Sequence, residues 1–178
     1  MNKRKALLYV LMAIAGLLSL PLKSIAQVKA SPENVMASFI YNFTAYLNWP
    51  EESQNNDFKI IVLGNDEIMS PLQYIGSKRT IQGRPIVVKK AVTFDEIEDC
   101  EMLFIGADAV SSIEKLKGSN KTESTVIITD CKDCLRNGIG INFVNEEDKI
   151  RFEINKSALE SKNIRISSQL LKLAVKVI

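Results

Sequence analysis

The pattern of hydrophobic and polar positions predicts a chain of alternating helices and strands. The first helix is expected to start at Ser31-Pro32-Glu33, because serine can cap a helix, proline fits its first position and glutamate favours its positive end. Apolar residues follow at helical spacing, namely Val35, Met36, Phe39, Ile40, Phe43 and Leu47. Asn48-Trp49-Pro50 is expected to end this helix, since a residue before proline avoids the helical region.

Four β-rich runs come next, at residues 58–63, 86–92, 102–105 and 125–129. Helical stretches are expected at 67–75 and 109–116. The first and third runs are continuously apolar, which is typical of strands that are covered on both faces of a sheet. This part of the chain therefore predicts β-α-β crossovers.

The last third of the chain has a different pattern. Two alternating segments, 139–144 and 149–154, are joined by a polar stretch, which predicts an antiparallel hairpin. A short helix is expected at 157–162, and Ser167 is expected to cap a final helix. The apolar positions of that final helix are Leu170, Leu171, Leu173, Ala174 and Val177. The whole order predicts a single three-layer α/β domain, with a mixed sheet of about six strands, a C-terminal β-hairpin and flanking helices.

The first 26 residues have the features of a cleavable secretory signal. Basic residues at 3–5 precede an uncharged run at 6–22, and Ser24-Ile25-Ala26 offers small residues to a signal peptidase. We expect cleavage after Ala26, which leaves one exported domain, residues 27–178. The alternative is an uncleaved anchor, although the run is at the short limit of the roughly 17–25 residues that span a membrane.

Cleavage would reverse the net charge. The chain has 23 basic and 21 acidic residues, and four basic residues lie in the signal, so 19 remain and the net charge changes from +2 to −2. No basic run is left to bind nucleic acid. The sequence contains no histidine, which removes the Ser-His and Cys-His nucleophile systems and the common zinc sites. A hydrolase or a metalloenzyme is therefore disfavoured, and we expect no metal or cofactor.

Two of the three cysteines are close in sequence. Cys131 and Cys134 can close a small disulfide loop in an oxidising compartment, or they can act as a redox pair. A catalytic pair favours a helix N-terminus, whereas this pair follows a strand and precedes a loop, and Asp133 between the thiols disfavours a thiolate. A structural or switchable disulfide is therefore expected. Cys100 is predicted to be a buried free thiol, with an intermolecular bridge as the alternative.

Several short segments occur in a specific order. They are 35–43 with Trp49-Pro50, then 58–64, 83–86, 100–105, 151–155 and 167–174. In this order they resemble the YfiR-like family of small periplasmic proteins, over nearly the whole chain after residue 26. The resemblance implies a non-enzymatic regulator that inhibits the periplasmic sensor domain of a membrane-bound diguanylate cyclase, in the control of cyclic di-GMP and biofilm formation. A histidine kinase is the alternative partner.

The resemblance also implies a homodimer, sequestration by an outer-membrane partner, and dependence on the disulfide state. We expect the aromatic helix and the cysteine loop to lie near the contact surface. The residues predicted to contact the partner are Phe39, Tyr41, Phe43 and Trp49. Two other classes stay open: a thiol-disulfide oxidoreductase that uses Cys131 and Cys134, and a small-ligand-binding envelope protein with an apolar pocket at the carboxyl ends of the strands.

Overall fold

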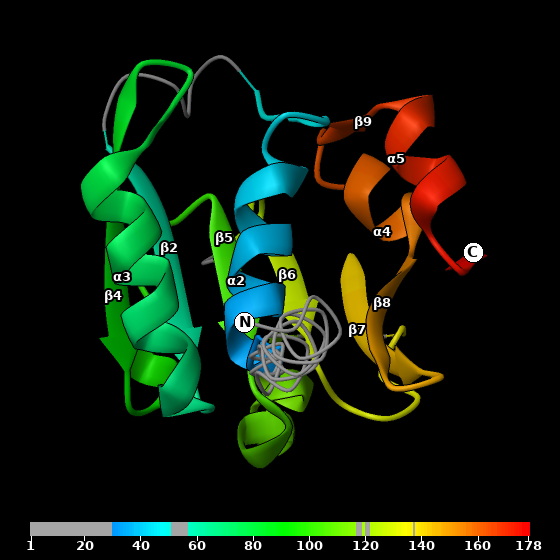
Figure 1. Ribbon diagram of the computed structural model, residues 1–178, viewed down its shortest axis with the longest axis horizontal. Coiled ribbons are helices and arrows are strands. Elements are labelled where there is room, and N and C mark those ends of the chain that lie inside the picture. Colours follow the sequence, from blue (N-terminus) through cyan, green and yellow to red (C-terminus); the bar gives the residue numbers. More distant parts are fainter. Residues whose placement is uncertain (1–29, 51–56, 117–118, 120–121, 137) are drawn as a thin grey trace, which may run out of the picture.

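The computed structural model describes residues 30–50, 57–116, 119, 122–136 and 138–178 (Figure 1). The predicted signal and its cleavage site lie outside these residues. The helices are α2 (Pro32–Phe43), α3 (Met69–Lys78), α4 (Lys156–Glu160) and α5 (Ser168–Leu173), with 3-10 helices η2 (Asp66–Ile68), η3 (Phe94–Glu96) and η4 (Ala107–Leu116). The strands are β1 (Leu47–Asn48), β2 (Phe58–Leu63), β3 (Thr80–Ile81), β4 (Arg84–Ala91), β5 (Met102–Ile105), β6 (Val126–Thr129), β7 (Ile141–Glu146), β8 (Lys149–Ile154), β9 (Arg165–Ile166) and β10 (Lys176–Val177).

Eight of these strands form one mixed sheet in the order β10-β8-β7-β6-β5-β2-β4-β3. The neighbours from β4 to β7 are parallel, and the predicted hairpin pairs β7 with β8 in antiparallel orientation. From β2 the chain passes to β4 on one side and then crosses to β5 on the other. The carboxyl ends of β2 and β5 therefore form a topological switch point, where open α/β sheets commonly bind ligands.

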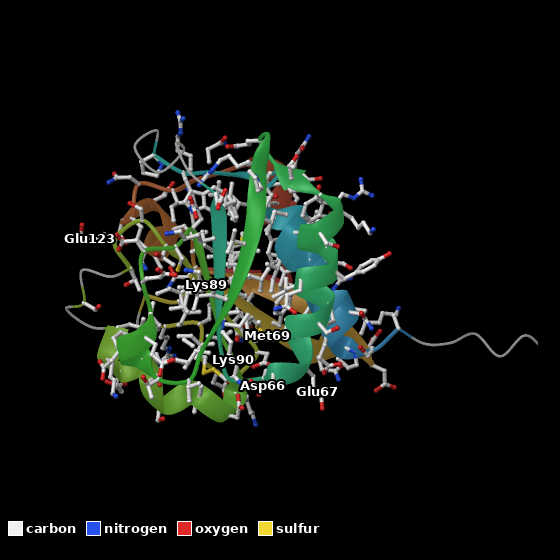
Figure 2. All side chains as sticks on the ribbon, turned by 90° about the vertical axis from the view of Figure 1, so that its left-hand side faces the viewer. Asp66, Glu67, Met69, Lys89, Lys90 and Glu123 are labelled. Atoms are coloured by element: carbon white, nitrogen blue, oxygen red, sulfur yellow. A yellow bond between two sulfur atoms is a disulfide. The ribbon has the colours of Figure 1, made fainter. Side chains whose placement is uncertain are left out.

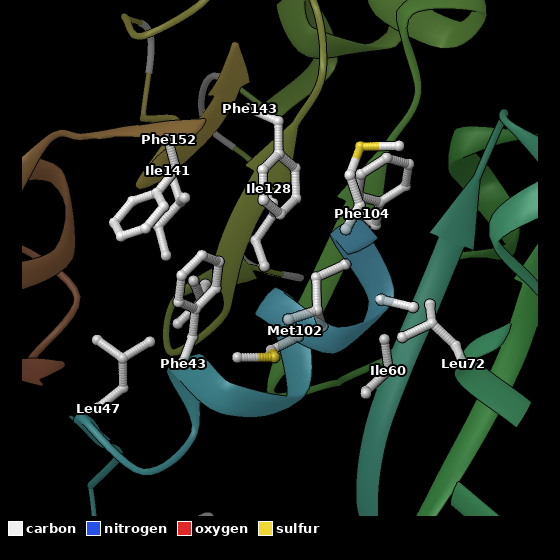
Figure 3. Close-up of a cluster of buried hydrophobic side chains, with 14 of the residues drawn as sticks. Phe43, Leu47, Ile60, Leu72, Met102, Phe104, Ile128, Ile141, Phe143 and Phe152 are labelled. Atoms are coloured by element: carbon white, nitrogen blue, oxygen red, sulfur yellow. The ribbon is translucent and has the colours of Figure 1, made fainter. Parts of the chain in front are cut away.

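The sheet separates two hydrophobic cores, which confirms the predicted α/β domain. In Figure 1, α2 and α3 lie over one face of the sheet. The core on this face contains Phe43 of α2 together with Ile60, Met102 and Ile128 of the sheet, as Figure 3 shows. The opposite core contains Ile61, Leu63, Leu103, Ile105 and Ile127 of the sheet, together with Phe94 of η3 and Ile113 of η4. Because both faces are covered, β2 and β5 are buried along nearly their whole length, as their continuous apolar runs predict.

The first helix begins as predicted but ends earlier than predicted. Ser31 caps α2, and its hydroxyl oxygen accepts a hydrogen bond of 3.3 Å from the backbone nitrogen of Asn34. The helix ends at Phe43 instead of Trp49-Pro50. The reason is tertiary, because the chain after the helix forms β1, where Leu47 pairs with Ile166 of β9. A partner more than 100 positions away leaves no local signal.

The C-terminal region contains shorter helices and more strands than predicted. The last helix, α5, ends at Leu173, and Val177 lies in β10, where it pairs with Ile154 of β8. The short edge strands β3 and β10 account for the eight strands in place of about six. The hairpin turn is Glu147-Asp148, with φ of 50° and 59°, as expected for a two-residue turn that matches the strand twist. The helix predicted at 109–116 is the 3-10 helix η4.

None of the helices in the described ranges combines the length and the apolar character that a membrane span requires.

Candidate functional site

The carboxyl ends of β2, β5 and β6 are tied together by polar side chains. The backbone nitrogen of Asn65 donates to Oδ1 of Asp108 at 2.9 Å, and Nδ2 of Asn65 donates to Oδ2 of Asp130 at 3.0 Å. The backbone nitrogen of Ala107 donates to Oδ1 of Asp130 at 2.6 Å. Asp130 directly follows β6, and its carboxylate therefore links the end of β6 to the segments after β2 and β5. Hydrogen bonds among the chain's own residues therefore cross the switch point.

Two glycines allow this close approach. Gly64 has φ of 76°, and a Cβ atom there would lie 2.3 Å from Oδ1 of Asp108. A Cβ atom at Gly106 would lie 2.8 Å from the backbone nitrogen of Asn65. Neither distance leaves room for a side chain, so the network requires glycine at both positions. On the neighbouring surface, Lys90 forms an ion pair with Asp66, and Figure 2 shows the two residues near each other.

A disulfide joins Cys131 and Cys134 in the loop directly after Asp130. Cys131 is 6% exposed and belongs to the core on the η3/η4 face, and Cys134 is partly buried against the same core. Residues 131–136 are not helical, so neither sulfur lies at a helix N-terminus, where a catalytic thiol would be activated. This arrangement favours a structural or switchable disulfide. The disulfide constrains the residue next to Asp130 and hence the end of β6.

Trp49 occupies the opposite edge of the sheet, at the amino ends of the strands. Its indole Nε1 donates a hydrogen bond of 3.0 Å to the carbonyl oxygen of Glu101, just before β5. Its ring packs edge-on against Phe58 at the start of β2, with ring centroids 5.1 Å apart. Trp49 is 4% exposed, and its contacts with Glu101 and Phe58 fasten the chain after α2 to the edge of the central sheet.

A buried ion pair lies beside this indole. The carboxylate of Glu101 pairs with the guanidinium of Arg84 and also accepts a hydrogen bond of 2.7 Å from the backbone nitrogen of Lys59. The side chains of Arg84 and Glu101 are only 10% and 8% exposed. Arg84 also lies over the ring of Phe58, 5.3 Å from its centroid. The sequence does not reveal this pair, although its members occur in two of the segments that resemble the YfiR-like family.

The four aromatic residues predicted to contact a partner differ in exposure. Phe43 is 1% exposed and Trp49 is 4% exposed, so both lie within the core. Phe39 and Tyr41 are partly buried and reach the surface of α2. The ring of Phe39 packs against that of Phe152, with centroids 5.5 Å apart. Phe39 and Tyr41 are therefore the two that a partner can reach without rearrangement of the core.

The buried Cys100 and the partly buried Lys162 both have shifted pKa values. Cys100 is free in the structure and 9% exposed, and its burial raises the pKa of the thiol to about 12. The ammonium of Lys162 donates to the carbonyl oxygens of Thr122 at 2.8 Å and Thr125 at 3.1 Å. Burial lowers the pKa of Lys162 to about 8. The sequence does not reveal Lys162, because nothing in its local pattern distinguishes it from an exposed lysine.

Within the ranges that the structure describes, no group of three or more His, Cys, Asp or Glu side chains is arranged to hold a metal ion.

The chain matches the model of a known protein family. The family model described as YfiR/HmsC-like matches residues 33–175. The chain belongs to the YfiR/HmsC-like family. Proteins of the YfiR/HmsC-like family are periplasmic regulators and are not catalytic. The match extends from the first turn of α2 to the residue before β10, so it includes both the Trp49 contact and the disulfide loop.

Two solved structures have a similar fold. One is a conserved domain protein from Vibrio cholerae O1 biovar El Tor, with 16% identity and a TM-score of 0.56 over 84% of this chain and 61% of that chain. The other is an ABC domain from Streptococcus pneumoniae in complex with L-Trp, with 12% identity and a TM-score of 0.54 over 83% of this chain and 60% of that chain. At these identities the likeness shows the fold alone, and the chain spans about three fifths of the length of either structure. A search of curated proteins found no match.

Proposed function

We propose that this protein is a non-enzymatic regulator that binds the periplasmic sensor domain of a membrane-bound signalling protein and holds that protein inactive. The observation that carries the proposal is the YfiR/HmsC-like match over residues 33–175. The inferred partner is a diguanylate cyclase, so that release of the regulator raises cyclic di-GMP and favours biofilm formation. A histidine kinase is the alternative partner. The acting form is residues 27–178, after cleavage behind Ala26.

The geometry of the sheet supports a binding role over a catalytic one. The switch point, where an α/β enzyme commonly places its substrate, is crossed by the hydrogen bonds that join Asn65, Asp108 and Asp130. The disulfide lies in a non-helical loop, so it lacks the environment that activates a catalytic cysteine. The chain has no histidine for acid-base chemistry at neutral pH. We therefore infer that the protein acts through surface contacts.

The contact surface that we infer lies on α2. Phe39 and Tyr41 are its partly exposed aromatic residues, and aromatic side chains frequently dominate the binding energy of an interface. Phe43 and Trp49 would support this surface from inside the core. We further infer that the protein acts as a homodimer, that an outer-membrane partner sequesters it, and that the Cys131–Cys134 loop influences the contact.

The test combines a binding measurement with a cellular readout. Calorimetry of the exported protein with the periplasmic domain of the sensor encoded beside it should show binding, and deletion of the regulator should raise the sensor's output. Tyr41→Asp should weaken this binding about tenfold or more, as expected for an interface anchor. The matched control is Val110→Asp on η4, at the opposite face of the sheet, which should bind like the wild type. No binding together with unchanged output would refute the proposal.

A further inference from the structure

Two hollows follow each other along the furrow between α2 and α3, which Figure 1 shows side by side over the same face of the sheet. They share Ser38 of α2 with Tyr74 and Ile75 of α3. The hollow at the C-terminal ends of the two helices has a volume of about 620 Å³, within the roughly 300–1,000 Å³ that binding pockets occupy. We call it the α2/α3 end pocket, and its other lining residues are Tyr41, Asn42, Lys78 and Arg79.

The helical repeat places the lining side chains on facing sides of the two helices. Tyr74 and Lys78 are four positions apart on α3, so their side chains lie one above the other. Ser38 and Tyr41 have the same relationship on α2, at a spacing of three. Tyr74 is 68% exposed and Tyr41 is partly exposed, although aromatic rings are stabilised by burial. The pocket thus presents two tyrosine rings that a partner can cover.

The α2/α3 end pocket is lined by two cations and by no carboxylate of the described residues. Lys78 and Arg79 are both exposed, and within the described ranges neither lies within ion-pair distance of a carboxylate. Lys78 belongs to the last turn of α3, where a cation favours the negative end of the helix. Arg79 follows the helix with extended backbone, at φ of −133° and ψ of 159°, so its charge lies beyond that turn.

The neighbouring hollow of the furrow has the opposite charge. Glu33 and Glu67 line it, and no cation of the described residues does. The furrow therefore has a negative end, where both helices start, and a positive end, where both helices finish. A carboxylate of a partner would be repelled at the first end and attracted at the second, so the charges determine where along the furrow an acidic group binds.

We propose that the α2/α3 end pocket receives an acidic side chain of the sensor domain, on a segment that also covers the two tyrosine rings with an apolar residue. The inference rests on the proposed function and adds to it the chemistry of the partner's contact. Tyrosine and arginine are enriched at interface hot spots, so a pocket that combines them suits a protein partner. A free inorganic anion would leave the two rings uncovered, and an anionic membrane would meet Glu33 and Glu67 in the same furrow.

The first test reverses the charge of the pocket. Calorimetry with the periplasmic domain of the sensor encoded beside the protein should show that Lys78→Glu/Arg79→Glu binds about tenfold or more weakly than the wild type. Lys78→Gln/Arg79→Gln should bind about threefold more weakly. The wild-type affinity should fall as NaCl is raised from about 0.05 to about 0.5 M, and the glutamine variant should lose most of this dependence. A purely structural role of the two cations would not change the salt dependence.

The matched control changes the net charge equally at another place. Arg165→Glu/Lys176→Glu alters two exposed cations of β9 and β10, which lie on the other side of the molecule from α3 in Figure 1. This variant should bind the sensor domain as the wild type does. Lys78 and Arg79 are also exposed, so the melting temperature of each variant should stay close to that of the wild type.

A second test identifies the acidic residue of the partner. Each exposed carboxylate of the sensor domain is replaced in turn by lysine, and every variant is titrated with the wild type and with Lys78→Glu/Arg79→Glu. One lysine-substituted sensor should bind the reversed protein about tenfold more tightly than the native sensor does, because the two reversals restore the attraction. The same sensor variant should bind the wild-type protein more weakly.

The possible failures can be told apart. Absence of binding by the wild type would refute the proposed function, and this inference with it. Wild-type binding that Lys78→Glu/Arg79→Glu leaves unchanged would overturn this inference alone, and so would failure of every lysine-substituted sensor to restore affinity. If the reversed protein instead loses self-association, or loses binding to phosphatidylglycerol vesicles, while its affinity for the sensor is unchanged, the pocket belongs to a second copy or to the membrane.

Discussion

The indole nitrogen of Trp49 donates a hydrogen bond to the carbonyl oxygen of Glu101, a residue 52 positions further along the chain. The same carbonyl oxygen accepts a hydrogen bond of 2.9 Å from the backbone nitrogen of Val126 at the start of β6. The carboxylate of Glu101 meanwhile binds Arg84 at the start of β4. One residue before β5 thus joins the chain after α2 to the starts of β4 and β6, and this gives the tryptophan that follows the aromatic helix a structural role.

Replacement of Trp49 by phenylalanine tests this contact. Trp49→Phe keeps an aromatic ring against Phe58 but removes the donor to Glu101, so we expect the free energy of unfolding to fall by about 1–3 kcal/mol. Trp49 is the only tryptophan of the chain, so urea unfolding should be followed by circular dichroism. Tyr74→Phe is the control, because Tyr74 is 68% exposed, and it should leave the stability unchanged. Equal stability of both variants would contradict the inferred role.

Removal of one member of the buried Arg84–Glu101 ion pair should strongly destabilise the fold. Arg84→Ala leaves the carboxylate of Glu101 buried without its guanidinium, and we expect a loss of about 3–5 kcal/mol in the free energy of unfolding. The double variant Arg84→Met/Glu101→Gln removes both charges and should recover part of this loss. Lys89→Ala breaks the exposed pair with Glu98 and should have little effect. If the double variant is no more stable than Arg84→Ala, the unpaired carboxylate of Glu101 is not the cause of the lost stability.

Stability should rise with pH on account of Lys162. Burial lowers the pKa of its ammonium from the usual 10.5 to about 8. Between these values the unfolded chain binds more protons than the folded chain, so the free energy of unfolding increases as the pH rises through the window. The full shift corresponds to roughly 3 kcal/mol between pH 7 and pH 10.5, and solvent reaches part of the side chain, so relative to Lys162→Met the wild type should gain about 2 kcal/mol over this range. A difference that does not change with pH would contradict this assignment.

The disulfide should matter more for partner binding than for global stability. Cys131 and Cys134 are three positions apart, and closing so short a loop contributes only about 2 kcal/mol in the chain-entropy model. We expect Cys131→Ser/Cys134→Ser to lose about this amount in urea unfolding, yet to bind the sensor domain markedly more weakly. Calorimetry against the wild type, oxidised and reduced, measures the second effect. Unchanged affinity for the sensor domain in the double variant and in the reduced wild type would show that the disulfide loop does not influence binding.

Cys100 should be unreactive in the native protein. Its thiol is buried, and its pKa of about 12 leaves almost no thiolate at pH 8. Iodoacetamide at pH 8 should therefore fail to modify the native protein, and it should add one group after unfolding without reductant. Mass spectrometry of the two samples gives the count directly. Rapid modification of the native protein, or a dimer that disappears on reduction, would favour the exposed or intermolecular alternative.

Local signals accounted for the features that the sequence predicts well. Ser31 and Ser167 cap their helices as expected, because capping depends on the neighbouring residues alone. The sequence predicts the hairpin because apolar and polar residues alternate along its two strands and a short polar turn joins them. The covered central strands were found because burial on both faces requires continuous apolar residues. Each of these features is determined by a few consecutive residues.

The features that the sequence did not predict depend on distant partners. Val177 fits the spacing of a final helix, yet pairing with Ile154 of β8 places it in an edge strand. The helix α2 ends before the predicted Trp49-Pro50 because Leu47 pairs with Ile166. The ion pair of Arg84 with Glu101 and the α2/α3 end pocket require the folded positions of several elements at once. Periodicity carries no information about such contacts.

The position of Asp130 has a consequence for how the domain opens in its native state. The carboxylate of Asp130, at the end of β6, accepts hydrogen bonds from the segments after β2 and β5. If either segment detaches, it breaks a hydrogen bond to the end of β6. The three strand ends should therefore open and close together, as a single foldon, and not fray one at a time. The disulfide beside Asp130 then acts on that whole unit, because a change at one loop alters the opening equilibrium of three strands.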